Sequence, residues 1–183
     1  LLKSKGYHFS KSVFLAGDGD HYIKDTEEQL SIKMKAPSYK TDDVNIQGYI
    51  GAHIDSGAKH FVTYCTLRDN QQLFTLAQAI RFDSYFSPDG LNVNFLIVKN
   101  SHHIDVVTYE KGIEKIMLSC GSGSVAAAFY ASQKENIQSP LKISNQGGNM
   151  NLIFNDAWDD VWLASNPTIS FSSEIDLESI NFS

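Results

Sequence analysis

The residue types that suggest chemistry in this sequence are concentrated in one short segment around a cysteine. Residues 119–124 read Ser-Cys-Gly-Ser-Gly-Ser and lead into the small, apolar run 125–128. This order predicts a strand that delivers Cys120 to a tight glycine loop, followed by a helix. The N-terminus of a helix offers free backbone N–H groups and the positive end of the helix dipole. Cys120 is therefore expected where an anion binds and where the thiolate form of a cysteine is favoured.

Two interpretations of this segment follow from its residues. A thiolate beside a carboxylate-binding loop is suited to removing a proton from the carbon next to that carboxylate. Gly121 and Gly123 would let the backbone approach such a ligand closely. The alternative is a plain strand-to-helix turn with a buried thiol, because free cysteine often behaves as a small core residue. The other cysteine, Cys65, lies in the apolar run 61–65 and is predicted to belong to the core.

The elements that must position this segment can be predicted from apolar periodicity and turn residues. The predicted strands cover residues 11–16, 21–25, 30–34, 48–54, 60–66, 92–99, 104–109, 141–144, 151–154 and 160–163. The predicted helices cover residues 72–84 and 124–134. Turns are predicted at residues 17–20, 55–59, 88–90 and 147–148, and a polar linker at residues 38–45. Many short strands with two helices predict an α+β fold with a mixed sheet.

Composition narrows the class of protein and the kind of partner. The chain has 183 residues, of which 42% are hydrophobic and 20% charged, so it is expected to bury a core. Its net charge of -6 argues against a nucleic-acid partner, because phosphates need a basic surface. No apolar run is long enough to span a bilayer, and nothing at its start resembles a signal peptide. Two cysteines without a disulfide framework fit a reducing, cytoplasmic setting.

Beyond these physical patterns, the cysteine segment resembles a known family. Residues 110–112 (Glu-Lys-Gly) followed by 119–124 are similar to the second cysteine motif of diaminopimelate epimerases, which reads Glu-Arg-Gly, a spacer and Ala/Ser-Cys-Gly-Thr/Ser-Gly. Three further landmarks are similar in order and spacing over nearly the whole chain. They are residues 54–62 (a Gly-Asn-Pro-His-x-Val turn), 89–95 (an Asn-Val-x-Phe strand) and 147–163 (the closing Gly-Gly and Trp-Leu strands). Four matches in order are much more specific than any one of them.

The resemblance implies a cofactor-independent amino-acid epimerase with a diaminopimelate-epimerase-like fold. That fold has two pseudo-symmetric halves, each a mixed sheet wrapped around a central helix, with the active site in the cleft between them. One thiolate removes the α-proton and a second thiol returns a proton on the opposite face, without pyridoxal phosphate or a metal. The implied reaction interconverts LL- and meso-diaminopimelate in the synthesis of lysine and peptidoglycan precursors. A small-molecule amino-acid substrate and a homodimer are implied as partners.

The resemblance also implies roles for individual residues. The implied catalytic residues are Cys120, Glu110 and His60, and the implied substrate-binding residues are Asn92, Lys111, Gly121, Ser122 and Gly123. Cys120 would be the acid/base of the second half, and the backbone N–H groups after it would hold the reacting carboxylate. Glu110 would lie near the substrate amine, His60 would order the thiol, and Asn92 would bond the far end of the substrate. From the residues alone, His60 also fits a partly buried turn histidine, and Asn92 a strand-edge residue that bonds its own turn.

The chain departs from the family pattern at its start. The first cysteine motif, of the Cys-Gly-Asn-Gly-x-Arg-Cys type, is absent and would fall just before Leu1. Residues 1–6 also resemble the last turn of a helix followed by a glycine stop. We therefore expect residues 1–46 to be a remnant of an amino-terminal domain, 47–166 to form the carboxyl-terminal epimerase domain, and 167–183 to be a tail returning toward the first domain. A two-base epimerase with one thiol is expected to be inactive as it stands.

Other departures fall on groups that would bind the far end of the substrate. Where the family has asparagine, proline and arginine, this chain has Ala58, Lys59 and Lys111. Arginine grips a carboxylate with two hydrogen bonds in a fixed geometry, and lysine does not. Two alternatives therefore stay open: a racemase of another amino acid on the same fold, or a non-catalytic half that binds a carboxylate or phosphate at residues 121–123. A cysteine-free isomerase relative is disfavoured by the presence of Cys120.

Overall fold

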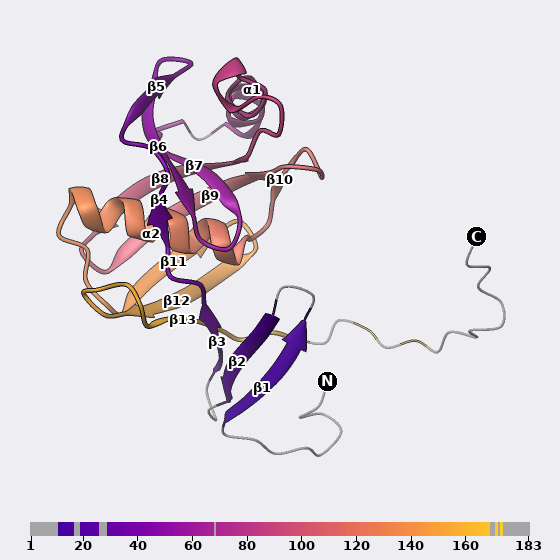
Figure 1. The fold of residues 1–183 in the computed structure, drawn as a ribbon, viewed down its shortest axis with the longest axis vertical. Coiled ribbons are helices and arrows are strands. Elements are labelled where there is room, and N and C mark those ends of the chain that lie inside the picture. Colours follow the sequence, from indigo (N-terminus) through magenta and orange to yellow (C-terminus); the bar gives the residue numbers. More distant parts are fainter. Residues whose placement is uncertain are drawn as a thin grey trace.

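The computed structural model places one helix inside a strongly curved sheet, with a second helix on the outer face of that sheet (Figure 1). The structure describes residues 11–16, 19–25, 29–67 and 69–168, together with residues 171 and 173. The predicted helix end at residues 1–6 and residues 17–18 of the first predicted turn lie outside this part of the chain. Most of the predicted carboxyl-terminal tail lies outside it as well.

The described residues form thirteen strands in one mixed sheet. They are β1 (Lys11–Ala16), β2 (Gly19–Asp25), β3 (Leu30–Met34), β4 (Ser38–Tyr39), β5 (Val44–Ile46), β6 (Tyr49–Asp55), β7 (Lys59–Tyr64), β8 (Asn92–Asn100), β9 (His103–Glu110), β10 (Lys115–Met117), β11 (Leu141–Asn145), β12 (Gly148–Phe154) and β13 (Val161–Ser165). Their order is β1-β2-β3-β13-β12-β11-β9-β8-β7-β6-β4, with β10 paired to β9 and β5 to β6. The pairs β7–β8 and β9–β11 are parallel, so the predicted α+β class with a mixed sheet is confirmed.

The helices are α1 (Asn70–Arg81), the short 3-10 helix η2 (Ser84–Phe86) and α2 (Gly121–Lys134). Asp69 caps α1, because its carboxylate accepts a hydrogen bond from the Gln72 N–H at 2.8 Å. No helix in the described residues is long and apolar enough to cross a bilayer. The prediction of a helix over 72–84 is confirmed in kind, but α1 starts two residues earlier and ends at Arg81, and a separate 3-10 helix, η2, begins at Ser84.

Three details of the prediction were wrong, each because pairing or capping overrides local pattern. Residues 38–45 are not a plain linker, since β4 and β5 both pair with β6. Strand β10, which was not predicted, is held by its pairing with β9 and is too short to show a periodicity. Helix α2 begins at Gly121, so the glycines form its first turn and not a loop before it, because Cys120 already supplies the cap.

Strands β7, β8 and β9 separate two apolar clusters, because successive side chains of a strand point to opposite faces. One face packs against α2 through Val62, Leu96 and Val106. The other packs against α1 through Phe61 and Tyr109, and it also holds Cys65, Val93 and Phe95. Cys65 is only 4% exposed, so its predicted place in the core is confirmed. Strand β3, in the predicted amino-terminal remnant, pairs with β13 over its whole length, so both predicted domains contribute to one sheet.

The buried face of α2 consists mainly of small residues. Ala126, Ala127 and Ala128 are fully buried and are contacted by side chains from strands on several sides of the helix. Short side chains let neighbouring elements approach a helix closely, since the separation depends on the residues at the contact. The alanine run is therefore what allows a curved sheet to surround α2 without leaving a void.

Replacing Ala127 by leucine should overpack this space and lower the free energy of unfolding by about 1–3 kcal/mol. The measurement is urea unfolding followed by circular dichroism. Gln133→Leu is the matched control, because Gln133 is exposed on the same helix and the change should stay within about 0.5 kcal/mol. Equal losses in the two variants would contradict a tightly enclosed α2.

Candidate functional site

Cys120 is the N-cap residue of α2, immediately after the segment that follows β10. Its backbone is extended (φ -146°, ψ 115°), and its carbonyl accepts from the Ser124 N–H at 2.9 Å. The Gly123 N–H points at the Cys120 Sγ at 3.4 Å. No acceptor within the described residues takes the backbone N–H of Gly121 or Ser122. Two free donors and a half-buried thiol therefore lie side by side at the positive end of the helix dipole.

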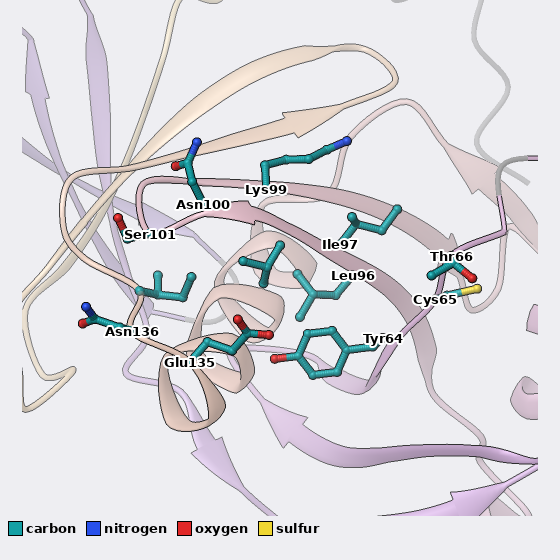
Figure 2. A pocket seen from close by; sticks show the side chains of 12 residues that line it. Tyr64, Cys65, Thr66, Leu96, Ile97, Lys99, Asn100, Ser101, Glu135 and Asn136 are labelled. Carbon is teal, nitrogen blue, oxygen red and sulfur yellow. The ribbon is translucent and has the colours of Figure 1, made fainter.

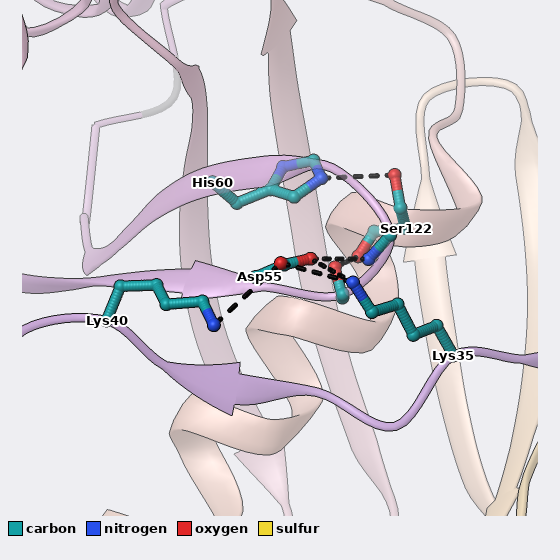
Figure 3. Close-up of polar contacts among 7 residues, drawn as sticks. Lys35, Lys40, Asp55, His60 and Ser122 are labelled. Carbon is teal, nitrogen blue, oxygen red and sulfur yellow. Dashed lines mark hydrogen bonds and ion pairs between the residues drawn. The ribbon is translucent and has the colours of Figure 1, made fainter. Parts of the chain in front are cut away.

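A chain of polar side chains runs from the thiol into the sheet. The Cys120 Sγ lies 3.6 Å from the Ser122 Oγ. That hydroxyl lies 3.0 Å from the Nε2 of His60 (Figure 3). The Nδ1 of His60 is 2.7 Å from the Oδ1 of Asn94. The Nδ2 of Asn94 in turn donates to the Thr108 Oγ1 at 2.8 Å. The structure therefore brings His60 to Cys120 as the resemblance implies, but through the Ser122 hydroxyl.

The sheet lines up the inner part of this chain. His60 on β7, Asn94 on β8 and Thr108 on β9 all point to the α2 side of three adjacent strands. Their exposed fractions are 0%, 0% and 2%. Buried polar groups need partners, and here each satisfies the next. Burial makes a charged imidazole unfavourable and lowers the pKa of His60 to about 4, against the smaller opposing effect of its Asn94 hydrogen bond.

Gly123 allows α2 to sit directly on these polar side chains. A Cβ at position 123 would lie 2.4 Å from the Asn94 Nδ2 and 3.0 Å from the Thr108 Oγ1. Any larger residue would displace the carboxamide or the helix. The second glycine of the motif is thus required by packing against the sheet, in addition to any role near a ligand.

The turn between β6 and β7 holds α2 from another side. The Ser56 hydroxyl donates to the Ser122 carbonyl at 2.7 Å. The neighbouring Asp55 carboxylate accepts from the Gly57 N–H at 2.9 Å and faces Lys35 and Lys40 (Figure 3). Burial opposes ionisation of Asp55, but the Gly57 hydrogen bond and the two ammonium groups outweigh it and lower its pKa.

Asn92 connects three segments at the edge of the site. Its Nδ2 donates to the Lys59 carbonyl at 3.1 Å, and its Oδ1 accepts from the Lys111 N–H at 2.8 Å. An amide has two donors and an acceptor with two lone pairs, so one hydrogen and one lone pair remain for a ligand. The bond to its own surroundings that the residues suggested is present, and its contact with the far end of a substrate stays a prediction.

Glu110 is the last residue of β9, and Lys111 opens the turn to β10. Within the described residues, neither side chain forms a hydrogen bond or ion pair. The turn is fixed instead by Glu114, whose Oε1 accepts from the Gly112 N–H at 2.9 Å and from Arg81 at 3.1 Å. Arg81 is only 8% exposed. A partly buried ion pair therefore holds the turn while the carboxylate and ammonium beside it stay available.

Sequence reasoning missed five polar residues that shape the site, namely Asn94, Thr108, Ser56 and the paired Arg81 and Glu114. A signal was present for Asn94, because it stands alone as a polar residue in the apolar run 93–98. Arg81 and Glu114 are far apart in sequence and carried no such signal. Their contact depends on Gly90 (φ +60°), where a Cβ would lie 1.6 Å from the guanidinium.

A cavity of about 570 Å³ lies away from this chemistry (Figure 2). It is lined by Tyr64, Lys99 and Glu135, among others, near the C-terminal end of α2, whereas Cys120 lies at the other end. None of the predicted site residues lines it. Across the described part of the chain, no group of three or more His, Cys, Asp or Glu side chains could hold a metal ion.

Comparison with known proteins identifies the family. The family described as diaminopimelate epimerase matches residues 52–163, so this chain belongs to the diaminopimelate epimerase family. A diaminopimelate epimerase of Chlorobaculum tepidum is 28% identical over 165 residues, covering 88% of this chain and 63% of the relative. One from Aquifex aeolicus is 30% identical over 173 residues, covering 92% of this chain and 62% of the relative. The chain therefore spans less than two thirds of the length of these relatives.

Solved structures support the same fold. A probable proline racemase of Agrobacterium radiobacter with bound carbonate superposes with a TM-score of 0.65 at 13% identity, covering 97% of this chain and 64% of that structure. A hydroxyproline epimerase of Agrobacterium vitis with bound trans-4-hydroxy-L-proline gives 0.63 at 11% identity, covering 90% and 60%. At these identities the similarity concerns the fold alone, and it agrees with the predicted diaminopimelate-epimerase-like architecture.

Gly123→Ala should lower the free energy of unfolding by about 1–3 kcal/mol, because the added methyl collides with the Asn94 carboxamide. Gly121→Ala is the matched control on the same helical turn. Its Cβ would meet only the flexible ends of Leu163 at 3.1 Å and Met34 at 3.7 Å, so stability should stay within about 1 kcal/mol. Chemical denaturation measures both, and equal stabilities would refute the close contact of α2 with Asn94.

The buried neutral His60 should make stability depend on pH between about 4 and 6.5. The unfolded chain takes up the proton first, because the folded pKa of His60 is about 4 against 6.5 unfolded. His60 therefore contributes fully above pH 6.5, and on the order of 3 kcal/mol is lost as pH falls to 4. Unfolding free energies of the wild type and His60→Gln across this range test this, since the variant should lack that part of the slope. Parallel pH profiles would show that His60 is not buried as a neutral base.

Proposed function

We propose that this chain carries one half of the active site of an amino-acid epimerase, with Cys120 as the acid/base on one face of the substrate. The proposed reaction interconverts LL- and meso-diaminopimelate by proton transfer to and from thiols. One observation carries the proposal: a half-buried thiol caps α2 beside the free N–H groups of Gly121 and Ser122. Membership of the diaminopimelate epimerase family and the names of its relatives support the substrate.

The geometry at α2 suits the chemistry of such a site. A carboxylate on the two free N–H groups would bring the carbon next to it close to the Cys120 Sγ. The helix dipole stabilises negative charge, both on a thiolate and on a substrate that loses its α-proton. In one direction the proton moves from the α-carbon to the Cys120 sulfur, the electron pair stays on the substrate, and a second acid delivers a proton to the opposite face. In the reverse direction the second group removes the proton and the Cys120 thiol delivers one.

The second acid in this proposal is not Cys65. That thiol is 4% exposed and belongs to the apolar cluster on the α1 face of the sheet. Cys65 and Cys120 are the two cysteines of this sequence. We therefore propose that a second thiol is supplied by polypeptide outside these residues, with 1–46 as part of the amino-terminal half and 167–183 as a tail returning toward it. A cytoplasmic homodimer is part of the same proposal.

Recognition of the far end of the substrate is where this chain differs from its family. The Lys59 ammonium lies 3.5 Å from the Asp89 carboxylate in an exposed ion pair, so its charge is partly neutralised. The Lys111 ammonium has no partner among the described residues and is the better candidate to meet a distal carboxylate. Because lysine replaces arginine there, a racemase of another amino acid on the same fold is the second candidate.

The test is proton exchange at the α-carbon of LL-diaminopimelate in D₂O, followed by mass spectrometry and chiral chromatography. The 183-residue chain should bind the substrate, which should protect Cys120 from iodoacetamide, but should not interconvert the stereoisomers. A longer polypeptide with the second thiol should exchange, and Cys120→Ala should lower that rate by at least about 10²–10⁴-fold. Cys65→Ala is the matched control and should retain exchange.

The outcomes separate the alternatives. Interconversion that persists in Cys120→Ala would overturn the proposal. Exchange with another amino acid, but none with diaminopimelate, would keep the mechanism and change the substrate. Anion binding that is unchanged in Cys120→Ala, with no exchange in the longer polypeptide, would favour a non-catalytic binding half.

A further inference from the structure

Asn94 is a fully buried polar side chain to which neither the family resemblance nor the proposed reaction gives a role. It sits between His60 and Thr108 at the inner end of the chain that leads to Cys120. A buried carboxamide in an apolar strand costs stability unless both of its polar atoms are bonded, as they are here. The direction of those two hydrogen bonds has a consequence at the thiol.

The direction follows from one atom to the next. The Asn94 Nδ2 donates to Thr108 at 2.8 Å, so the carbonyl oxygen of Asn94 faces the Nδ1 of His60 at 2.7 Å. A carbonyl oxygen only accepts, so Nδ1 must carry the proton of the imidazole. Burial lowers the pKa of His60 to about 4, so the ring is neutral near pH 7 and its Nε2 is left as an acceptor. The Ser122 hydroxyl, 3.0 Å away, is then the donor to Nε2.

We propose that Asn94 is a positioning residue that turns the Ser122 hydroxyl toward His60, so that Ser122 offers only a lone pair to Cys120. The Ser122 Oγ is 3.6 Å from the sulfur, and in this orientation it accepts from a thiol S–H and cannot donate to a thiolate. This contact opposes the Gly123 N–H, which donates to the sulfur from 3.4 Å. Asn94 thereby tunes Cys120 toward the proton-donor form. The inference rests on the proposed function for its purpose, since it concerns the reacting thiol.

The other titratable groups around this network of polar side chains are the same in all variants used in the test. Asp55 and His53, both on β6, act on His60 through space, and Lys35 and Lys40 face Asp55. The members of this polar network on β8 and β9 are Asn94 and Thr108, and both are uncharged. Glu110 at the end of β9 and Lys111 after it form no hydrogen bond or ion pair with this network among the described residues. Comparison between variants removes the constant effect of these groups.

The decisive variant is Asn94→Asp, which keeps the shape of the side chain. A carboxylate beside Nδ1 favours a second proton on the ring of His60, so Nε2 becomes a donor and the Ser122 hydroxyl turns to the sulfur. The pH midpoint for alkylation of Cys120 by iodoacetamide should fall by about one unit, which is a roughly tenfold faster reaction below the midpoint. Peptide mass spectrometry distinguishes Cys120 from Cys65.

A second variant and two controls isolate the mechanism. Thr108→Val frees the Asn94 carboxamide to rotate and should shift the midpoint in the same direction by less; it carries the test if Asn94→Asp does not fold. In a His60→Gln background, Asn94→Asp should leave the midpoint unchanged or raise it, since only a nearby negative charge remains. Thr63→Val removes a buried hydroxyl that donates to the Ile50 carbonyl on the same sheet and is not part of the polar network. This variant should leave the pH midpoint for alkylation of Cys120 unchanged.

The results are separable from those of the proposed function. A midpoint that does not move in Asn94→Asp, or that moves equally with and without His60, would make Asn94 a structural residue only. The predicted shifts without any α-proton exchange in the longer polypeptide would support this inference while the proposed reaction fails. Exchange without the shifts would support the reaction and overturn the inference.

Discussion

The first turn of α2 rests on the buried carboxamide of Asn94, and the site depends on that contact. A Cβ at Gly123 would come within 2.4 Å of the amide nitrogen, so the helix can approach the sheet this closely only with glycine at that position. The approach sets where Cys120 caps the helix and where the free N–H groups point. The rest of α2 must run at the same short distance inside the curved sheet, and this explains why small alanine side chains form its buried face immediately after the glycines.

Burial and hydrogen bonding oppose each other beneath that helix turn. Three adjacent strands place His60, Asn94 and Thr108 in an apolar surrounding, where an unsatisfied polar group would be costly. Each is satisfied by the next, so the histidine stays neutral and the network keeps one direction. At the surface of the same site, Asp55 stays ionised because a backbone N–H and two lysines outweigh its partial burial. The charged groups of the site therefore lie at its surface, and the polar groups buried beneath α2 are neutral.

The turn after β9 is built differently from the thiol end of the candidate site. Around Cys120 the geometry is set by packed backbone and by a glycine that tolerates no substitution without movement. Around Lys111, a partly buried Arg81–Glu114 ion pair fixes the turn, while the ammonium group of the lysine has no partner among the described residues. The two ends of the site thus depend on separate sets of contacts. In the proposed reaction, a change of substrate would require changes only at the second set of contacts.

The sequence by itself determined the alternating strands, the two helices and the place of Cys120 at the start of the second helix, because apolar periodicity, turn residues and helix caps are local properties of a chain. It also determined the family, through four motifs in order. Tertiary structure decided the short strands β4, β5 and β10, which exist only because β6 and β9 offer them backbone partners. It likewise decided that Asn94 meets His60 and that Arg81 meets Glu114. Such contacts join residues far apart in the chain, and which of them form depends on the register and spacing of packed elements, which no local pattern encodes.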